Sequence, residues 1–115
     1  MDETSAVKAL SALAQESRIA AFRLLVKAGP GGMAAGDIAR TLDVPHNTLS
    51  AHLAILGNAG LVGSRRAGRS VIYSVNYAGT RDLLAYLMEE CCQGAPEVCA
   101  PALACVLPEC CEDAR

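Results

Sequence analysis

The reactive side chains of this 115-residue chain are concentrated near one end. All six cysteines lie in the segment CCQGAPEVCAPALACVLPECC, residues 91–111, and residues 1–90 contain none. Thiolates are soft ligands and are readily oxidised, so a dense cluster favours a soft ion or a redox switch. The cysteines form two sets of nearly mirrored spacing: Cys91, Cys92 and Cys99, then Cys105, Cys110 and Cys111.

Four arrangements suit these thiols. Trivalent arsenic or antimony accepts three sulfurs in a pyramid and needs no fourth ligand. Zinc, cadmium or lead would take four sulfurs drawn from all six cysteines, although zinc sites often include histidine and this segment has none. Reversible disulfides would make a redox switch, and a solvated tail that scavenges ions would have no defined site. The thiols by themselves leave these alternatives open.

Charge separates the cysteine segment from the rest of the chain. Residues 1–90 carry nine Lys or Arg and eight Asp or Glu, a net of +1, whereas residues 91–115 carry one Arg and four acids, a net of −3. We predict a folded domain over residues 1–92 and a cysteine-rich metal-binding tail over residues 93–115. No apolar run has the length of a signal peptide or a membrane span, so we expect a cytoplasmic protein with reduced thiols.

Before the cysteines, the sequence predicts a mainly α domain with one β-hairpin. Apolar residues recur at helical spacing in residues 5–14, 16–28, 34–44, 46–60 and 80–92. Alternation predicts a hairpin from LVGSRR and SVIYSVN, joined by AGR. The expected inward residues of the three central helices are Ile19, Phe22, Leu25 and Val26; Ile38, Ala39 and Leu42; and Leu49, Leu53 and Leu56. The outer helices carry stripes of Val7, Leu10, Leu13 and Ala14, and of Leu83, Leu84, Leu87 and Met88.

The helix predicted over residues 46–60 has an unusual outer face. Its outward and flanking residues are Asn47, Thr48, Ser50, Ala51, His52, Ala54 and Asn58. A solvated face normally has more Lys and Glu, whereas a small, polar face suits a helix in the major groove of DNA. The residues expected to meet base edges there are Asn47, Thr48, Ser50 and His52. Simpler roles stay open, namely helix capping for Asn47 and Thr48 and packing at the core edge for His52.

Three arginines are predicted at the tip of the hairpin: Arg65, Arg66 and Arg69. They would neutralise backbone phosphates and fix the position of the protein on DNA. A solvated turn is the simpler alternative. The order of helix, turn, helix and basic hairpin supports DNA binding more strongly than any of these residues alone.

The segment GDIARTLDVPHNTLSAHLAILGNAGLVGSRRAGRSVIYSVN resembles the DNA-binding part of the ArsR/SmtB family of metal-sensing bacterial repressors. The most telling pieces are S-x-H-L at Ser50–Leu53 and AGLV at residues 59–62, and the similarity extends over residues 5–92. It implies a winged helix-turn-helix and a homodimer formed through the first and last helices, residues 5–14 and 80–92. Such a dimer would bind double-stranded DNA at an inverted-repeat operator.

The resemblance also bears on the thiols. The Cys-x-Cys pair of the best-known arsenic sensors corresponds here to Ala34 and Gly36, and the last helix lacks the histidines of the zinc-type site. What remains is similar to a rarer subgroup, whose ligands correspond to Cys91, Cys92 and Cys99. This implies a repressor that arsenite or antimonite releases from DNA, with no organic cofactor. A second site at Cys105, Cys110 and Cys111 stays open.

Two other functions fit the same residues. One is a repressor whose cysteines sense oxidation, and the other is a cysteine-rich metal carrier or buffer that does not bind DNA. Catalysis is not expected, because no Ser/His/Asp or Cys/His pairing stands at plausible positions and both histidines lie in the predicted recognition helix.

Overall fold

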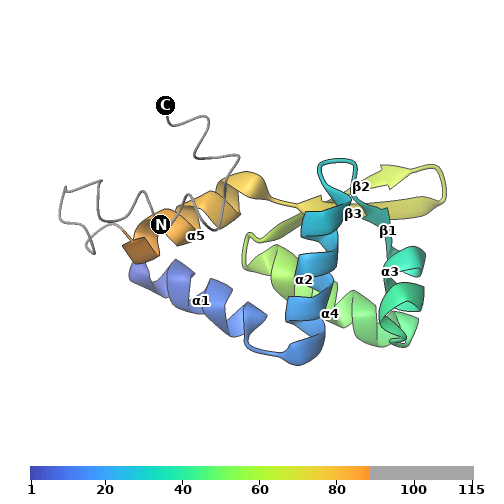
Figure 1. The fold of residues 1–115 in the computed structure, drawn as a ribbon, viewed down its shortest axis with the longest axis horizontal. Helices are drawn as coiled ribbons and strands as arrows, with labels where there is room; N and C mark the ends of the chain where they lie inside the picture. Colours follow the sequence, from blue (N-terminus) through green and yellow to red (C-terminus); the bar gives the residue numbers. More distant parts are fainter. Residues whose placement is uncertain (89–115) are drawn as a thin grey trace. The chain divides into compact units, whose positions relative to one another are not determined.

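The computed structural model describes residues 1–88, so all six cysteines lie outside the described residues. These residues form five helices and three short strands, whose arrangement is drawn in Figure 1. In chain order they are α1 (Glu3–Leu13), α2 (Glu16–Ala28), β1 (Met33–Ala34), α3 (Ala35–Leu42), α4 (His46–Asn58), β2 (Val62–Ala67), β3 (Ser70–Val75) and α5 (Tyr77–Met88). This is the predicted winged helix-turn-helix, mainly α with one β-hairpin.

The predicted hairpin is the larger part of an antiparallel sheet in the order β1-β3-β2. Ala67 pairs with Ser70, so only Gly68 and Arg69 form the turn. Gly68 has φ +65, as a two-residue turn with glycine at its first central position requires. The sequence analysis did not predict β1, because two residues are too few to show a period.

Helix α2 lies at the centre of the fold, where it contacts α1, α3, α4 and β3. Leu25 and Ala21 on its inner face are completely buried. The prediction that Ile19 and Val26 point inward was wrong, because their side chains are 45% and 49% exposed. Residues seven apart on a helix share a face, and this pair lies far around the helix from Ala21 and Leu25. The other predicted inward residues of α3 and α4 are buried or half-buried.

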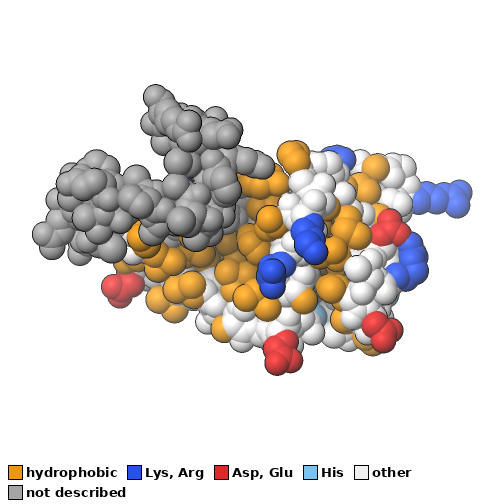
Figure 2. Space-filling model, in the orientation of Figure 1, with side chains coloured by type: hydrophobic (Ala, Val, Ile, Leu, Met, Phe, Trp, Pro, Cys, Tyr) orange, Lys and Arg blue, Asp and Glu red, His pale blue; other side chains and the backbone are white. Residues whose placement is uncertain are grey.

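Helix α1 packs through small residues. Ala6, Ala9 and Ala12 are at most 2% exposed, whereas Val7 and Leu10 are 58% and 43% exposed. The apolar stripe noted in the sequence therefore lies outside the core of the described chain. Figure 2 shows hydrophobic side chains gathered on the visible face over α1 and α2. The small alanines allow α1 to approach α2 and α4 closely, and the larger apolar side chains of α1 stay exposed in the described chain.

Residues Met1–Leu83 form one compact unit, and a second begins at Leu84, within α5. The start of α5 packs very closely against the backbone of residue 60, and both residues at this contact, Gly60 and Gly79, are glycines. A Cβ at Gly79 would lie 1.9 Å from the carbonyl oxygen of Gly60, so no larger residue fits there. The predicted boundary after residue 92 lies outside the described residues. In the described part of the chain, no helix is long and apolar enough to cross a membrane.

Candidate nucleic-acid interface

Helix α4 buries three leucines on one side and exposes mostly small or polar residues on the other, as the sequence predicts. Leu49, Leu53 and Leu56 are at most 1% exposed. On the other side the exposed residues are Asn47, Thr48, Ser50, Ala51, Ala54 and Asn58, together with the larger Ile55, which is 41% exposed. The three leucines fix the rotation of α4 against α2 and α3, so the polar face has a defined direction. Its side chains carry donors and acceptors suited to base edges.

The first turn of α4 is open to a ligand. Asp43, in the left-handed conformation with φ 54, ends α3, and Pro45 stands at the N-cap position of α4. No side chain caps α4, and its first turn contains no acidic residue. Asn47 and Thr48 therefore do not cap the helix, which removes one of their simpler alternatives. Uncapped N–H groups at a helix start attract anions such as phosphate.

His52 is placed differently from the other three predicted base-contacting residues. Its side chain is half-buried, and Nδ1 lies 3.5 Å from Nη1 of Arg18. The guanidinium only donates, so Nδ1 can take part in this contact only as an acceptor. Arg18 also donates from Nε to the carbonyl oxygen of Ala12, at 2.6 Å. Arg18 thereby links the end of α1 to the middle of α4. Base contact by His52 stays a prediction.

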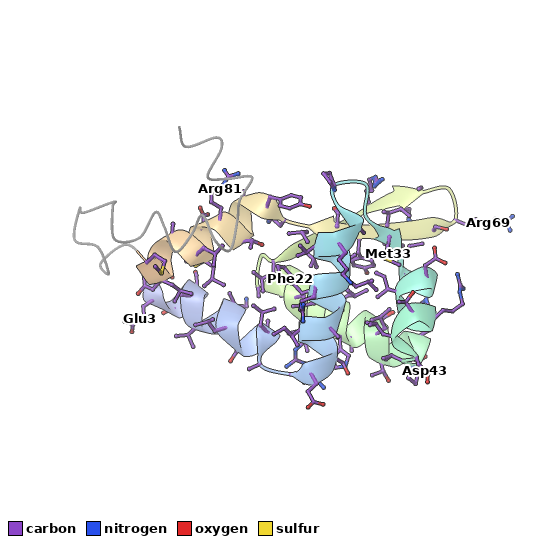
Figure 3. The ribbon with its side chains drawn as sticks, viewed as in Figure 1. Glu3, Phe22, Met33, Asp43, Arg69 and Arg81 are labelled. Carbon is purple, nitrogen blue, oxygen red and sulfur yellow. The ribbon has the colours of Figure 1, made fainter. Side chains whose placement is uncertain are left out.

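The hairpin, called the wing below, does not group its arginines at one point. Arg69 lies in the turn and projects from the end of the wing, as Figure 3 shows. Arg65 and Arg66 are consecutive residues of β2, so they point to opposite faces of the wing. Arg65 donates from Nη2 to the carbonyl oxygen of Gly31, at 3.1 Å, and so holds the α2–β1 loop. All three arginines are exposed.

A pocket of about 390 Å³ lies between the wing, α3 and the start of α4, and we call it the α3–wing pocket. It is lined by Ala34, Ala35, Gly36, Asp37, Arg40, His46, Arg69, Ser70 and Val71. Of these, the sequence analysis predicted a DNA contact only for Arg69. Asp37, Arg40 and His46 come from two separate helices, and no single stretch of sequence signals that they meet.

The positions that correspond to a Cys-x-Cys pair, Ala34 and Gly36, line this pocket with small, inert residues. Within residues 1–88, no group of His, Cys, Asp and Glu is arranged to hold a metal ion. The predicted ligands Cys91, Cys92 and Cys99 and the second set Cys105, Cys110 and Cys111 lie outside the described residues.

Known proteins with similar sequences or structures are helix-turn-helix proteins, in agreement with the fold described above. Residues 13–65 match a family of helix-turn-helix domains. NolR from Sinorhizobium fredii is 31% identical, covers 75% of this chain and 83% of its own, and has a TM-score of 0.60. The homodimeric winged helix-turn-helix DNA-binding domain of a possible ArsR-family transcriptional regulator from Mycobacterium bovis is 25% identical, with 76% and 85% covered and a TM-score of 0.62. A possible transcriptional regulator for arsenical resistance is 27% identical, with 71% and 82% covered and a TM-score of 0.63. No curated protein sequence matches the chain.

Proposed function

The chain belongs to the ArsR family of winged helix-turn-helix transcriptional regulators, and from this membership we propose that it is a cytoplasmic homodimeric repressor released from its operator by trivalent arsenic or antimony. The family and the fold are those of DNA-binding regulators rather than enzymes. Different features of the chain support DNA binding, dimerisation and the response to a metalloid.

One observation carries the DNA-binding role, namely the exposed polar face of α4 above its buried leucines. Asn47, Thr48 and Ser50 lie near the uncapped start of the helix, where they would enter the major groove first. Arg66 and Arg69 on the wing would bind phosphates and fix the helix in that groove. Arg65 can join them as well, because its bond to the Gly31 carbonyl uses only one of the five N–H donors of the guanidinium.

Two observations support the homodimer. Val7 and Leu10 expose apolar side chains on α1, and burial of such residues drives association. The similar domain from Mycobacterium bovis is homodimeric. We propose that residues 5–14 and 80–92 of two chains form the interface. A two-fold axis would then set the two α4 helices about one DNA turn apart, as an inverted repeat requires.

The effector proposal rests on donor chemistry. Three thiolates suit a trivalent metalloid, and in the sequence Cys91 and Cys92 come within four residues of Met88 and Cys99 seven residues after Cys92. A relative described as a possible regulator for arsenical resistance adds support. The bound ion would tie the end of the dimerisation helix to the following segment and shift the spacing of the two α4 helices. DNA affinity would fall by a factor of ten for each ~1.4 kcal/mol of coupling.

Fluorescence anisotropy of labelled promoter DNA, with reduced protein and an arsenite titration, tests this proposal. We expect the native chain to bind the DNA tightly and to release it near one equivalent of arsenite per chain. The Cys91→Ser variant should stay bound to DNA at the same arsenite concentration. Cys105→Ser is the matched control and should respond like the native chain. Release by peroxide but not by arsenite would replace the metalloid with an oxidative signal. Several ions bound per chain without any DNA binding would favour a metal carrier instead.

A further inference from the structure

We propose that the α3–wing pocket binds one phosphate of the DNA backbone and that Asp37, inside this pocket, weakens that binding. The inference rests on the proposed DNA-binding function and adds a defined subsite to it. It assigns roles to Asp37, Arg40 and His46, none of which carries a predicted contact with bases or with an effector.

The pocket has the donors that a phosphate needs. Arg40 and Arg69 supply two positive charges, and His46 adds an N–H donor in either tautomer. Asp37 supplies the single negative charge, so the lining is net positive. Ala34, Ala35 and Gly36 form a wall of small side chains that leaves room for a tetrahedral anion. The volume of about 390 Å³ exceeds that of one phosphate group, so a backbone segment with its sugars can approach.

The position of the pocket supplies the second argument. His46 is the first residue of α4, and Arg69 lies in the turn of the wing, so the pocket spans the interval between the two. A helix in the major groove is flanked by the phosphate strand that borders that groove. If α4 enters the groove and the wing lies beyond its edge, that strand must cross the interval. The strand would present its phosphates to the pocket.

Asp37 opposes this contact through two effects. Its carboxylate forms an ion pair with the guanidinium of Arg40, one helical turn away in α3. A phosphate must therefore share the guanidinium of Arg40 with Asp37, and it also meets the negative charge of the carboxylate. Both side chains are well exposed, at 75% for Arg40 and 53% for Asp37, so the pair is screened and can be exchanged. We infer that Asp37 keeps the affinity for phosphate moderate and does not abolish it.

The variant Asp37→Asn gives the sharpest test, because removing the negative charge while keeping the size of the side chain should raise affinity. Anisotropy should show about two- to fivefold tighter binding at low salt, both to promoter DNA and to unrelated DNA of equal length. The gain should shrink as KCl is added. Glu16→Gln removes the same charge from the first turn of α2, outside the pocket, and should bind like the native chain.

Arg40→Gln tests the same site by removing a positive charge that should favour phosphate binding. Binding should weaken on both DNAs, and the slope of log affinity against log salt should lose about one unit, the value of one phosphate contact. Both substituted side chains are exposed, and circular dichroism would confirm that α3 is intact. A native slope in Arg40→Gln, or equal affinities of Asp37→Asn and Glu16→Gln, would overturn the phosphate site.

A gain by Asp37→Asn on promoter DNA alone would also overturn it, since that result would make Asp37 a base-contacting residue. These outcomes leave the proposed repressor function standing, because the native chain still binds its operator in each of them. Failure of the native chain to bind either DNA at low salt overturns both proposals together.

Discussion

Helices α1 and α4 distribute their side chains in opposite ways. In α4 the leucines Leu49, Leu53 and Leu56 are buried, and the exposed side is mostly small and polar, with Ile55 as its one large apolar residue. In α1 the alanines are buried, and the large residues Val7 and Leu10 are exposed. The α4 pattern is that of a helix held firmly by its own domain while its other face is left to a polar ligand. The α1 pattern is that of a helix shared between its own domain and a second apolar surface.

The N-termini of α1 and α4 also differ, because only α1 is capped by a side chain. The carboxylate of Asp2 caps α1, whereas α4 has no side-chain cap and no acid in its first turn. The cap at Asp2 satisfies the N–H of Ser5 and places a negative charge at the start of α1, whereas the uncapped start of α4 can donate to phosphate. Arg18 joins the helices physically, through the Ala12 carbonyl and the His52 ring. The four predictions below test whether the difference between α1 and α4 is energetic as well as geometric.

The largest effect is expected from Leu53→Ala in α4. Leu53 is 1% exposed, so the substitution removes buried methyl groups and leaves a cavity. We expect a loss of about 3 kcal/mol in the free energy of unfolding. Ile55→Ala, on the same helix but 41% exposed, should cost less than about 1 kcal/mol. Urea denaturation at one protein concentration, with reductant present, measures both. Equal losses would show that the leucines of α4 do not form its anchoring face.

The second prediction concerns the outer face of α1. Leu10→Asp places a charge on the proposed interface, where Leu10 is 43% exposed in the single chain. We expect the dimer dissociation constant to rise about 30-fold, from about 2 kcal/mol of lost apolar burial. Ile55→Asp makes the same change at a similar exposure on α4 and should leave dimerisation unchanged. Sedimentation equilibrium provides the measurement. An unaffected Leu10→Asp dimer would place the interface elsewhere.

The contrast between α1 and α4 also explains how far the sequence alone could go. Helix bounds, the hairpin and the leucine face of α4 follow from local periodicity, and the residues 16–28 predicted for α2 match its bounds. Periodicity shows that a helix has an apolar face but not which surface covers it. Ile19 and Val26 were therefore assigned to the core although they are exposed.

Some residues of the candidate site could be predicted from the sequence and others could not. Asn47, Thr48 and Ser50 could be predicted to be exposed, because they lie outside the stripe of leucines on one helix. The meeting of Asp37 and Arg40 in α3, His46 in α4 and Arg69 in the wing could not, since it depends on how three elements pack. The link from Arg18 to His52 crosses 34 residues and has no local signal either.

That link gives the third prediction. Arg18→Gln removes the charged bonds to the Ala12 carbonyl and to Nδ1 of His52. Because charge-assisted bonds are partly offset by solvent at a half-buried site, we expect a loss of about 1 kcal/mol in the free energy of unfolding. Arg23→Gln, at an exposed position of the same helix, should change stability by less than about half as much. Thermal and urea unfolding that rank the two variants equally would show that Arg18 does not tie α1 to α4.

The smallest effect is a pH dependence that α1 shows and α4 lacks. The backbone N–H of Ser5 donates to Oδ1 of Asp2 at 2.8 Å, and this bond lowers the pKa of Asp2 below its ordinary 3.8. A lowered pKa means that the cap is fully present above pH 3.8 and is lost only as the pH falls through the lower, folded value. The amide resonance of Ser5 should therefore titrate with a midpoint below 3.8 in an NMR series, while Asp2→Asn abolishes the titration. The amides in the first turn of α4, which have no carboxylate partner, should not follow this midpoint. If the Ser5 amide titrated at 3.8 or above, Asp2 would not stabilise the start of α1, and the contrast between a capped α1 and an uncapped α4 would fail.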